Sequence, residues 1–148
     1  MTRFLVTGSS GFIGDALFSN LYHKGYKVKG TIRGVEKLSK IKTDNIFFNC
    51  NIDNNTDWSK ILQNIDCIIH CAGQNSDISI FKKKNLRNYR KVNVDGTSNL
   101  AYQAAKSGVK KIIFLSSIKV FEQNSETSFL FNNNSKTNSN DPYGISKI

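Results

Sequence analysis

The segment Thr7-Gly8-Ser9-Ser10-Gly11-Phe12-Ile13-Gly14 decides the fold of this chain of 148 residues. The apolar segment Arg3–Thr7 before it is typical of a short strand buried on both faces. After it, apolar residues recur at helical spacing up to Lys24, namely Ile13, Leu17 and Leu21. Glycines between a strand and a helix allow the backbone to approach a pyrophosphate, and the first turn of the helix offers it free N–H groups. The segment therefore predicts a dinucleotide-binding turn at the start of a βαβ unit.

Strand and helix patterns alternate along the rest of the chain as well. Further strands are expected at Tyr26–Ile32, Ile46–Cys50, Asp66–Cys71 and Lys110–Ser116. Helices are expected near Asp57–Gln63 and from Leu86 to Lys106. This order predicts an α/β fold: a doubly wound, Rossmann-like parallel sheet covered on both faces, with Trp58 in its core.

The C-terminal part departs from this pattern. Residues 122–141 are polar and predict a long loop. Asp141-Pro142 is a helix-start signal, with the aspartate as N-cap and the proline in the first helical position. Because the sequence stops at Ile148, inside that helix, we expect residues 1–148 to be one dinucleotide-binding domain, incomplete at its C-terminus, with no substrate domain after it.

Composition excludes several classes of protein and raises the question of what the positive charge binds. With 39% hydrophobic residues, wholesale disorder is not expected. No apolar run is long enough for a membrane span or a signal peptide, which predicts a cytoplasmic protein without a membrane partner. Cys50, Cys67 and Cys71 form no metal-binding pattern, and Cys67 and Cys71, four apart in an apolar run, are expected to be reduced, buried thiols. The net charge of +10 fits nucleic acid, an anionic membrane or a phosphate-bearing small molecule, and does not by itself decide among them.

Five blocks resemble, in order, the extended short-chain dehydrogenase/reductases, which include sugar-nucleotide epimerases, dehydratases and ketoreductases. The first is the glycine segment, and the others are Asp66–Gly73, Asn93-Val94-Asp95-Gly96-Thr97, Phe114–Val120 and Tyr143-Gly144-Ile145-Ser146-Lys147. Together they extend over almost the whole chain.

The resemblance implies NADP or NAD as cofactor. It assigns to cofactor binding Gly8, Ser10, Gly11, Phe12, Ile13, Gly14, Arg33, Asn51, Ile52, Cys71, Ala72, Gly73, Asn93 and Lys147. Arg33, at the end of the second strand, is similar to the cation that accommodates a 2′-phosphate in NADP-preferring members, although an arginine there could also stack on adenine or face water. Asn51 stands where the family usually has an aspartate, and Asn93 could equally be a helix cap or a packing residue.

The resemblance also implies a catalytic set of Ser117, Tyr143 and Lys147. Tyr143 and Lys147 are four apart, so they lie on one face of a helix. A neighbouring ammonium favours the phenolate form of a tyrosine, as acid–base catalysis requires. By resemblance, Tyr143 transfers a proton to or from the substrate oxygen, Lys147 binds the nicotinamide ribose and Ser117 hydrogen-bonds the reacting oxygen.

The residues that follow Ser117 favour some of the reactions found in this family over others. The 4,6-dehydratases carry an Asp-Glu pair after the serine, where this chain has Ile118-Lys119, so a dehydratase is disfavoured. The Phe114–Val120 block is most similar to bacterial UDP-sugar 4-epimerases and 4-ketoreductases of O-antigen and surface-polysaccharide synthesis, whose members are often homodimers. The expected partner is therefore a UDP-linked sugar. A catalytically silent dinucleotide-binding module stays open as an alternative; nucleic-acid binding is disfavoured because no recognition motif is present.

Overall fold

The structure is a computed structural model that describes residues 1–34, 45–47, 50–75, 86–121, 131–132 and 134–148. Expectations for residues 35–44, 48–49, 76–85, 122–130 and 133 lie outside the described residues, including most of the long polar loop.

One parallel sheet organises the chain, and its strand order is β3-β2-β1-β4-β5. Its strands are β1 (Arg3–Thr7), β2 (Lys27–Thr31), β3 (Ile46–Phe47), β4 (Cys67–His70) and β5 (Lys111–Phe114). All four pairings are parallel, and Thr7 lies opposite both Thr31 and His70. The chain order reverses beside β1, and ligands of open α/β sheets bind at such a switch point, at the carboxyl ends of the strands. The predicted α/β class and doubly wound parallel sheet are confirmed.

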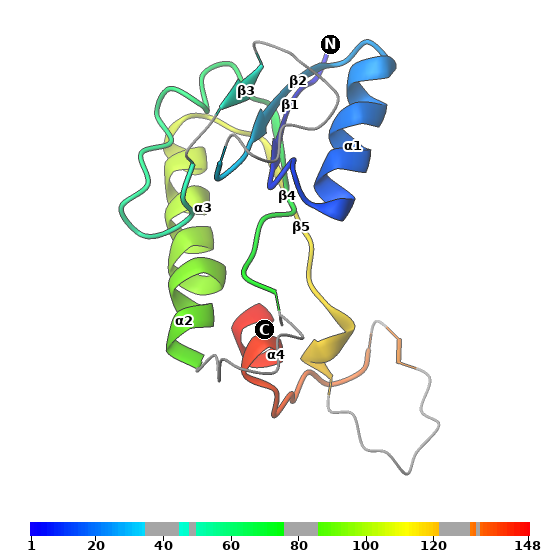
Figure 1. Cartoon of the computed structure of the whole chain (residues 1–148), viewed down its shortest axis with the longest axis vertical. Coiled ribbons are helices and arrows are strands. Elements are labelled where there is room, and N and C mark those ends of the chain that lie inside the picture. Colours follow the sequence, from blue (N-terminus) through cyan, green and yellow to red (C-terminus); the bar gives the residue numbers. More distant parts are fainter. Residues whose placement is uncertain (35–44, 48–49, 76–85, 122–130, 133) are drawn as a thin grey trace.

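Two hydrophobic clusters fill the space between the sheet and its helices. Helix α1 (Phe12–His23) covers one face, where Phe18 packs with Val6, Val28 and Ile69. The long helical segment after residue 86 lies on the opposite side of the sheet (Figure 1). There Trp58 is fully buried with Leu5, Leu62, Ile68 and Leu100, so its predicted core position is confirmed.

The expected apolar face of α1 is confirmed at Leu17 and Leu21, which pack against the cluster that contains Phe18, but not at Ile13. Phe18 is fully buried, whereas Ile13 is 51% exposed. Gly14 and Phe18 are the buried residues of the helix, because the close contact of α1 with the glycine turn is made through Gly14. Helical spacing alone could not indicate that Ile13 turns away from the sheet.

The predicted helix from Leu86 to Lys106 is continuous but not regular. It consists of α2 (Leu86–Arg90), the π-helical η2 (Lys91–Gly96) and α3 (Thr97–Lys106). Gly96 lies against the chain after β3, where a Cβ atom would come within 2.6 Å of Ile52 Cγ2. Single π turns inside α-helices are frequent at functional sites, and this one contains Asn93.

The expected helix at Asp57–Gln63 is wrong, because the described residues there form turns. One helical bond exists, from the Leu62 N–H to the Trp58 carbonyl at 2.9 Å. The carbonyls of Ile61 and Gln63 instead accept bonds from Lys29 Nζ, at 3.3 and 2.9 Å. Asn64 then takes a left-handed conformation with φ 61°. A tertiary donor thus replaces the bonds that a longer helix would have made.

Past the sheet, two short helices adjoin each other: η3 (Ile118–Val120), a 3-10 turn, and α4 (Pro142–Lys147) (Figure 1). The predicted helix start is confirmed, because Asp141 Oδ1 accepts the Gly144 N–H at 2.9 Å with Pro142 in the first turn.

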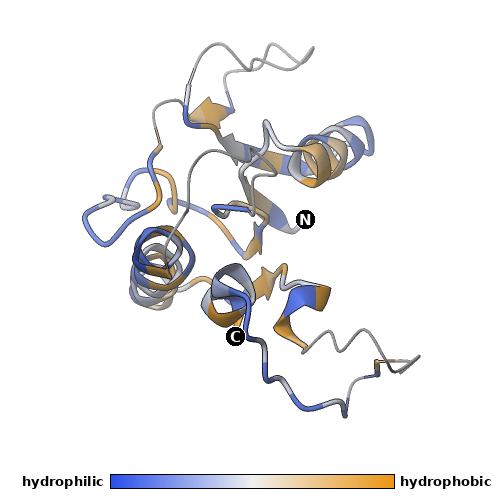
Figure 2. Ribbon diagram, turned by 60° about the horizontal axis from the view of Figure 1, so that its bottom comes forward, coloured by the Kyte–Doolittle hydropathy of each residue, from blue (hydrophilic) through white to orange (hydrophobic). Residues whose placement is uncertain are grey.

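Strand β5 is at the sheet edge and is exposed along its length, with Ile113 at 44%. The described helices cover both faces of the sheet through its centre, but none of them packs over β5. The strands carry much of the hydrophobic colour in Figure 2, and the turns after β3 are largely hydrophilic. Within the described residues, no helix is both long and apolar enough to cross a membrane.

Candidate functional site

The glycine turn lies at the carboxyl end of β1, and its three glycines meet different demands. Gly8 has a φ of 68°, and a Cβ there would be 2.8 Å from Ala72 Cα. A Cβ on Gly14 would overlap the carbonyl oxygen of Gly8. A Cβ on Gly11 would have only that same carbonyl oxygen nearby, at 3.3 Å. Gly8 and Gly14 are therefore required by the fold, whereas a Cβ on Gly11 would need only a small shift of that oxygen.

The first turn of α1 is open to an anion. Gly11 is the N-cap of the helix, and no side chain caps the N–H groups that follow. The side chains of Phe12 (97% exposed) and Ile13 lie away from the protein interior, so these residues contribute only their backbone to the inner side of the turn. Unpaired N–H groups and the positive end of the helix dipole together suit a phosphate.

Ser9 is a residue of this turn that sequence analysis missed. Its N–H and its Oγ both donate to the Thr31 carbonyl, at 3.0 and 3.2 Å, and the side chain is 2% exposed. Gly30 permits this contact, because a Cβ there would be 2.6 Å from Ser9 Oγ. Ser9 thus ties the turn to β2, a role with no local sequence signal.

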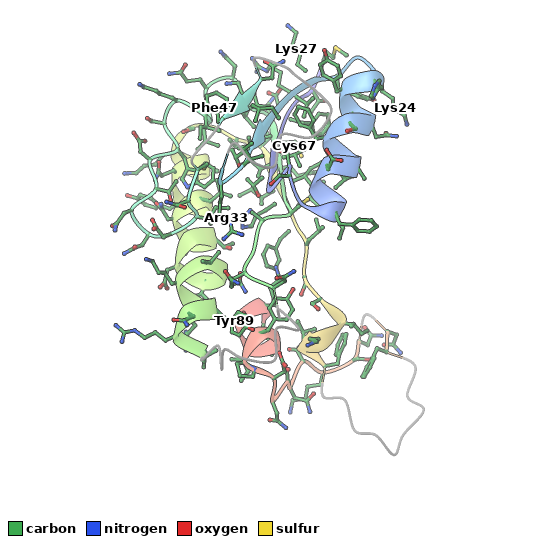
Figure 3. All side chains as sticks on the ribbon, viewed as in Figure 1. Lys24, Lys27, Arg33, Phe47, Cys67 and Tyr89 are labelled. Carbon is green, nitrogen blue, oxygen red and sulfur yellow. The ribbon has the colours of Figure 1, made fainter. Side chains whose placement is uncertain are left out.

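Arg33 and Asn51 lie close to each other in the fold, because the Cys50 N–H donates to the Ile32 carbonyl at 3.0 Å. Both residues are exposed, and Arg33 lies beyond the end of β2 (Figure 3). Ile52 is 8% exposed and belongs to the core cluster. An open cavity of about 440 Å³ adjoins Asn51 and is lined among others by Phe47, Asp53 and Lys60.

At the end of β4, Cys71-Ala72-Gly73 passes between the glycine turn and the C-terminal helix. The Ala72 N–H donates to Thr7 Oγ1 at 3.2 Å. A Cβ on Gly73 would lie 3.1 Å from Asn93 Oδ1 and 3.8 Å from Lys147 Nζ. The structure therefore brings Gly73, Asn93 and Lys147 together from three distant parts of the sequence.

Asn93 has all its polar atoms engaged within the protein. Its Oδ1 accepts the Gln74 N–H at 2.7 Å, and its Nδ2 donates to the Gln74 carbonyl at 3.0 Å and to Ser146 Oγ at 2.9 Å. The residue is 4% exposed. Of the alternatives that the sequence left open, this geometry favours packing and positioning. Its partners Gln74 and Ser146 were not predicted, because their contacts depend on tertiary structure.

Ser117 and Tyr143 belong to adjoining helices beyond the sheet. Ser117 caps η3, and its Oγ accepts the Lys119 N–H at 3.2 Å. Tyr143 is half-buried, with its ring 5.8 Å from that of Tyr89, which Figure 3 shows beside α4. The cation 5.9 Å from the Tyr143 ring is Lys119, which also pairs with Asp141 at 3.7 Å.

Lys147 is buried, at 8% exposure. Its Nζ lies 4.2 Å above the Phe114 ring at the end of β5. Burial lowers its pKa from the ordinary lysine value, while the neighbouring Cys71 partly opposes that shift. The amine therefore reaches the carboxyl end of the sheet from the last turn of α4, beside the strand ends that border the glycine turn.

The three cysteines are free, and burial raises the pKa of each thiol, that of Cys50 to about 11. Among the described residues, no cluster of histidine, cysteine and acidic side chains could hold a metal ion.

Comparison with known proteins places this geometry in context. The model of the NAD dependent epimerase/dehydratase family matches residues 4–148. The chain is 37% identical over 145 residues to a UDP-glucose 4-epimerase of Vibrio cholerae. This match covers 97% of this chain and 43% of the relative. It is also 29% identical over 160 residues to a UDP-glucose 4-epimerase of Pisum sativum, and this match covers 99% of this chain and 45% of the relative.

Solved structures give the same picture. A short-chain dehydrogenase/reductase superfamily protein from Agrobacterium tumefaciens with bound NAD superposes with a TM-score of 0.79 at 26% identity, over 98% of this chain and 42% of that one. The UDP-glucuronic acid 4-epimerase from Bacillus cereus in complex with NAD superposes with a TM-score of 0.76 at 25% identity. The match covers 99% of this chain and 49% of that one. The chain thus spans less than half the length of these proteins.

Proposed function

The chain belongs to the NAD dependent epimerase/dehydratase family, and we propose that it is the dinucleotide-binding part of an enzyme that transfers a hydride at C4 of a UDP-linked sugar. Epimerisation and reduction of a 4-keto sugar are the two reactions of this kind. The observation that carries the proposal is the meeting of the uncapped α1 N-terminus, Gly73, Asn93 and Lys147 at one edge of the sheet. The curated epimerase relatives support the substrate class.

The residues present fit a bound dinucleotide. The free N–H groups after Gly11 would receive the pyrophosphate, and the space beside Gly11 leaves the backbone accessible to it. Asn51 and Ile52 would border the adenine, and Cys71, Ala72 and Gly73 would line the path toward Lys147. When bound, the dinucleotide supplies the hydride chemistry.

Three residues would act on the substrate. Tyr143 would exchange a proton with the oxygen at C4, and Lys147 would hold the ribose beside it. Ser117 would donate its hydroxyl hydrogen to the same oxygen; this is compatible with its present contact, in which Ser117 Oγ is the acceptor. The ammonium of Lys119 lies 5.9 Å from the centre of the Tyr143 ring, and its pairing with Asp141 joins η3 to the start of α4.

Arg33 supports NADP over NAD. It is exposed beyond β2, and no carboxylate occupies its position to accept bonds from a free ribose 2′-hydroxyl. The solved relatives described above contain NAD, so NAD is the second candidate. We expect Arg33→Ala to weaken NADPH binding by about tenfold or more and to leave NADH binding nearly unchanged, because one charge-assisted contact to the 2′-phosphate is lost. Titration calorimetry with both nucleotides measures this.

The remaining assignments are part of the same proposal. The segment that completes the sugar site would come from outside these 148 residues, and a homodimer, a cytoplasmic location and a role in surface-polysaccharide synthesis are predictions. We expect the 148-residue chain alone to bind NADPH weakly and to turn over no substrate.

The decisive experiment measures two reactions of the full-length enzyme: NADPH oxidation against a panel of UDP-4-keto sugars, and interconversion of C4 epimers of UDP-sugars, which consumes no net NADPH. Tyr143→Phe should lower kcat by at least about a hundredfold, since it removes the transferred proton. Tyr102→Phe is the matched control, because Tyr102 is 60% exposed on α3. Nucleotide binding without turnover of any sugar would favour the silent binding module instead.

A further inference from the structure

His70, the last residue of β4, is a buried polar side chain that the proposed chemistry does not use. It is 1% exposed. Its Nδ1 lies 2.6 Å from Thr7 Oγ1, and its Nε2 lies 3.0 Å from Thr97 Oγ1. The ring therefore spans from the end of β1, across β4, to the first residue of α3.

The surrounding bonds favour one direction for each contact. Thr7 Oγ1 already accepts the Ala72 N–H, so its own hydrogen is free to be donated to His70 Nδ1. Nδ1 is then an acceptor, and the neutral ring carries its proton on Nε2, which donates to Thr97 Oγ1. Burial and the charge of Lys147 lower the pKa of His70 to about 4, which agrees with a neutral ring.

Both partners of the ring lie beside parts of the dinucleotide site. Thr7 directly precedes Gly8, whose backbone packs against Ala72. Thr97 directly follows Gly96, the last residue of the π turn that contains Asn93. The distance between the glycine turn and the Asn93 segment is thus set in part by the width of one imidazole.

We infer that His70 is a positioning residue: in its neutral Nε2–H form it accepts the Thr7 hydroxyl at Nδ1 and so holds the glycine turn against the end of β4, while the bond to Thr97 orients the ring. It thereby keeps the dinucleotide site in its binding geometry before any ligand arrives. The effect on nucleotide affinity rests on the proposed function, whereas the effect on the turn does not.

Two substitutions each keep half of the ring's hydrogen bonding. His70→Asn retains an acceptor near Nδ1 for Thr7, and His70→Gln retains a donor near Nε2 for Thr97. His70→Leu retains neither. Since the Thr7 bond holds the turn itself, we expect His70→Asn to bind NADPH within about threefold of the wild type, and His70→Gln and His70→Leu about tenfold more weakly. Thr97→Val should resemble His70→Asn.

Hydrogen exchange of the amides from Gly8 to Gly14 gives a readout without ligand. Exchange should accelerate by about tenfold in His70→Gln and His70→Leu, and little in His70→Asn. His23→Leu is the matched control, because His23 is exposed on α1. In the wild type, the ¹⁵N spectrum of the histidine ring should show Nδ1 unprotonated and Nε2 protonated, which requires no variant to fold.

Equal exchange rates and equal affinities in the three His70 variants would overturn the inference, as would a ring protonated on Nδ1. If the wild type binds neither NADPH nor NADH, the proposed function fails. The exchange rates of the turn would still decide the role of His70.

Discussion

At the scale of single residues, Gly11 and Gly14 belong to one motif but are needed for different reasons. Gly14 is needed because α1 begins in contact with the Gly8 carbonyl, and no side chain fits between them. A Cβ on Gly11 would lie 3.3 Å from the same oxygen, a tight distance that a small shift relieves; in the proposed function, its lack of a side chain leaves room for the pyrophosphate. The sequence pattern predicted both positions but could not distinguish these reasons.

This difference is testable by alanine substitution. Gly14→Ala should lower the free energy of unfolding by about 2 kcal/mol or more, because the new methyl group forces α1 away from β1. Gly11→Ala should cost less, about 1 kcal/mol, because alanine is a poorer N-cap than glycine, and yet weaken NADPH binding. Urea denaturation measures the first effect and titration calorimetry the second; equal stability of the two variants would contradict this account.

His70 also makes stability depend on pH. Its folded pKa of about 4 is below the ordinary value of about 6.5 for an unfolded chain. Between these values the unfolded chain binds more protons, so stability falls as the pH is lowered through this window, by about 3 kcal/mol in total from this residue. His70→Asn should lose that dependence, which urea denaturation from pH 7 to pH 4 measures. Asp66 contributes in a more acidic window, because hydrogen bonds from Arg3 lower the pKa of its carboxyl.

At the scale of elements, strands were predicted better than short helices. The core of each expected strand is found, because short apolar runs between turn signals are local features. The expected helix at Asp57–Gln63 is absent, and the carbonyls at its end accept bonds from Lys29, which is more than thirty residues away in sequence. The helix after Leu86 has the predicted extent, but its π turn depends on the contact between Gly96 and Ile52.

Helix α4 depends on a close contact at Gly144. A Cβ there would overlap the Lys119 carbonyl and Ser139 Oγ. Gly144→Ala should therefore separate α4 from η3 and displace Tyr143 and Lys147 from Ser117. Ile145→Ala, on the exposed side of the same helix, is the control. We expect amide exchange at Ser146 and Lys147 to accelerate about tenfold or more in Gly144→Ala only.

At the scale of the whole molecule, the sheet ends in an exposed apolar edge. Ile112, Ile113 and Phe114 of β5 are each between 38% and 44% exposed. An open edge strand with apolar side chains on both faces is a surface for self-association. The net charge of +10 opposes such contacts between copies through repulsion.

Self-association should therefore grow as salt screens this charge. Light scattering of the 148-residue chain should show oligomers that increase with protein and salt concentration. Ile113→Lys should suppress them, because it places a charge on the edge strand, whereas Tyr102→Lys on α3 should not. A chain that stays monomeric at high salt would contradict this role of β5.

The sequence by itself determined the parallel sheet, the glycine turn and the cap of α4, since strand periodicity, glycine spacing and capping residues act over a few neighbouring positions. The tertiary structure alone decided which side chains meet: Ser9 with β2, Asn93 with Gln74 and Ser146, Lys147 with Phe114, and His70 between Thr7 and Thr97. Those contacts join residues from separate elements. Their geometry depends on how the helices pack against the sheet, which no local pattern encodes.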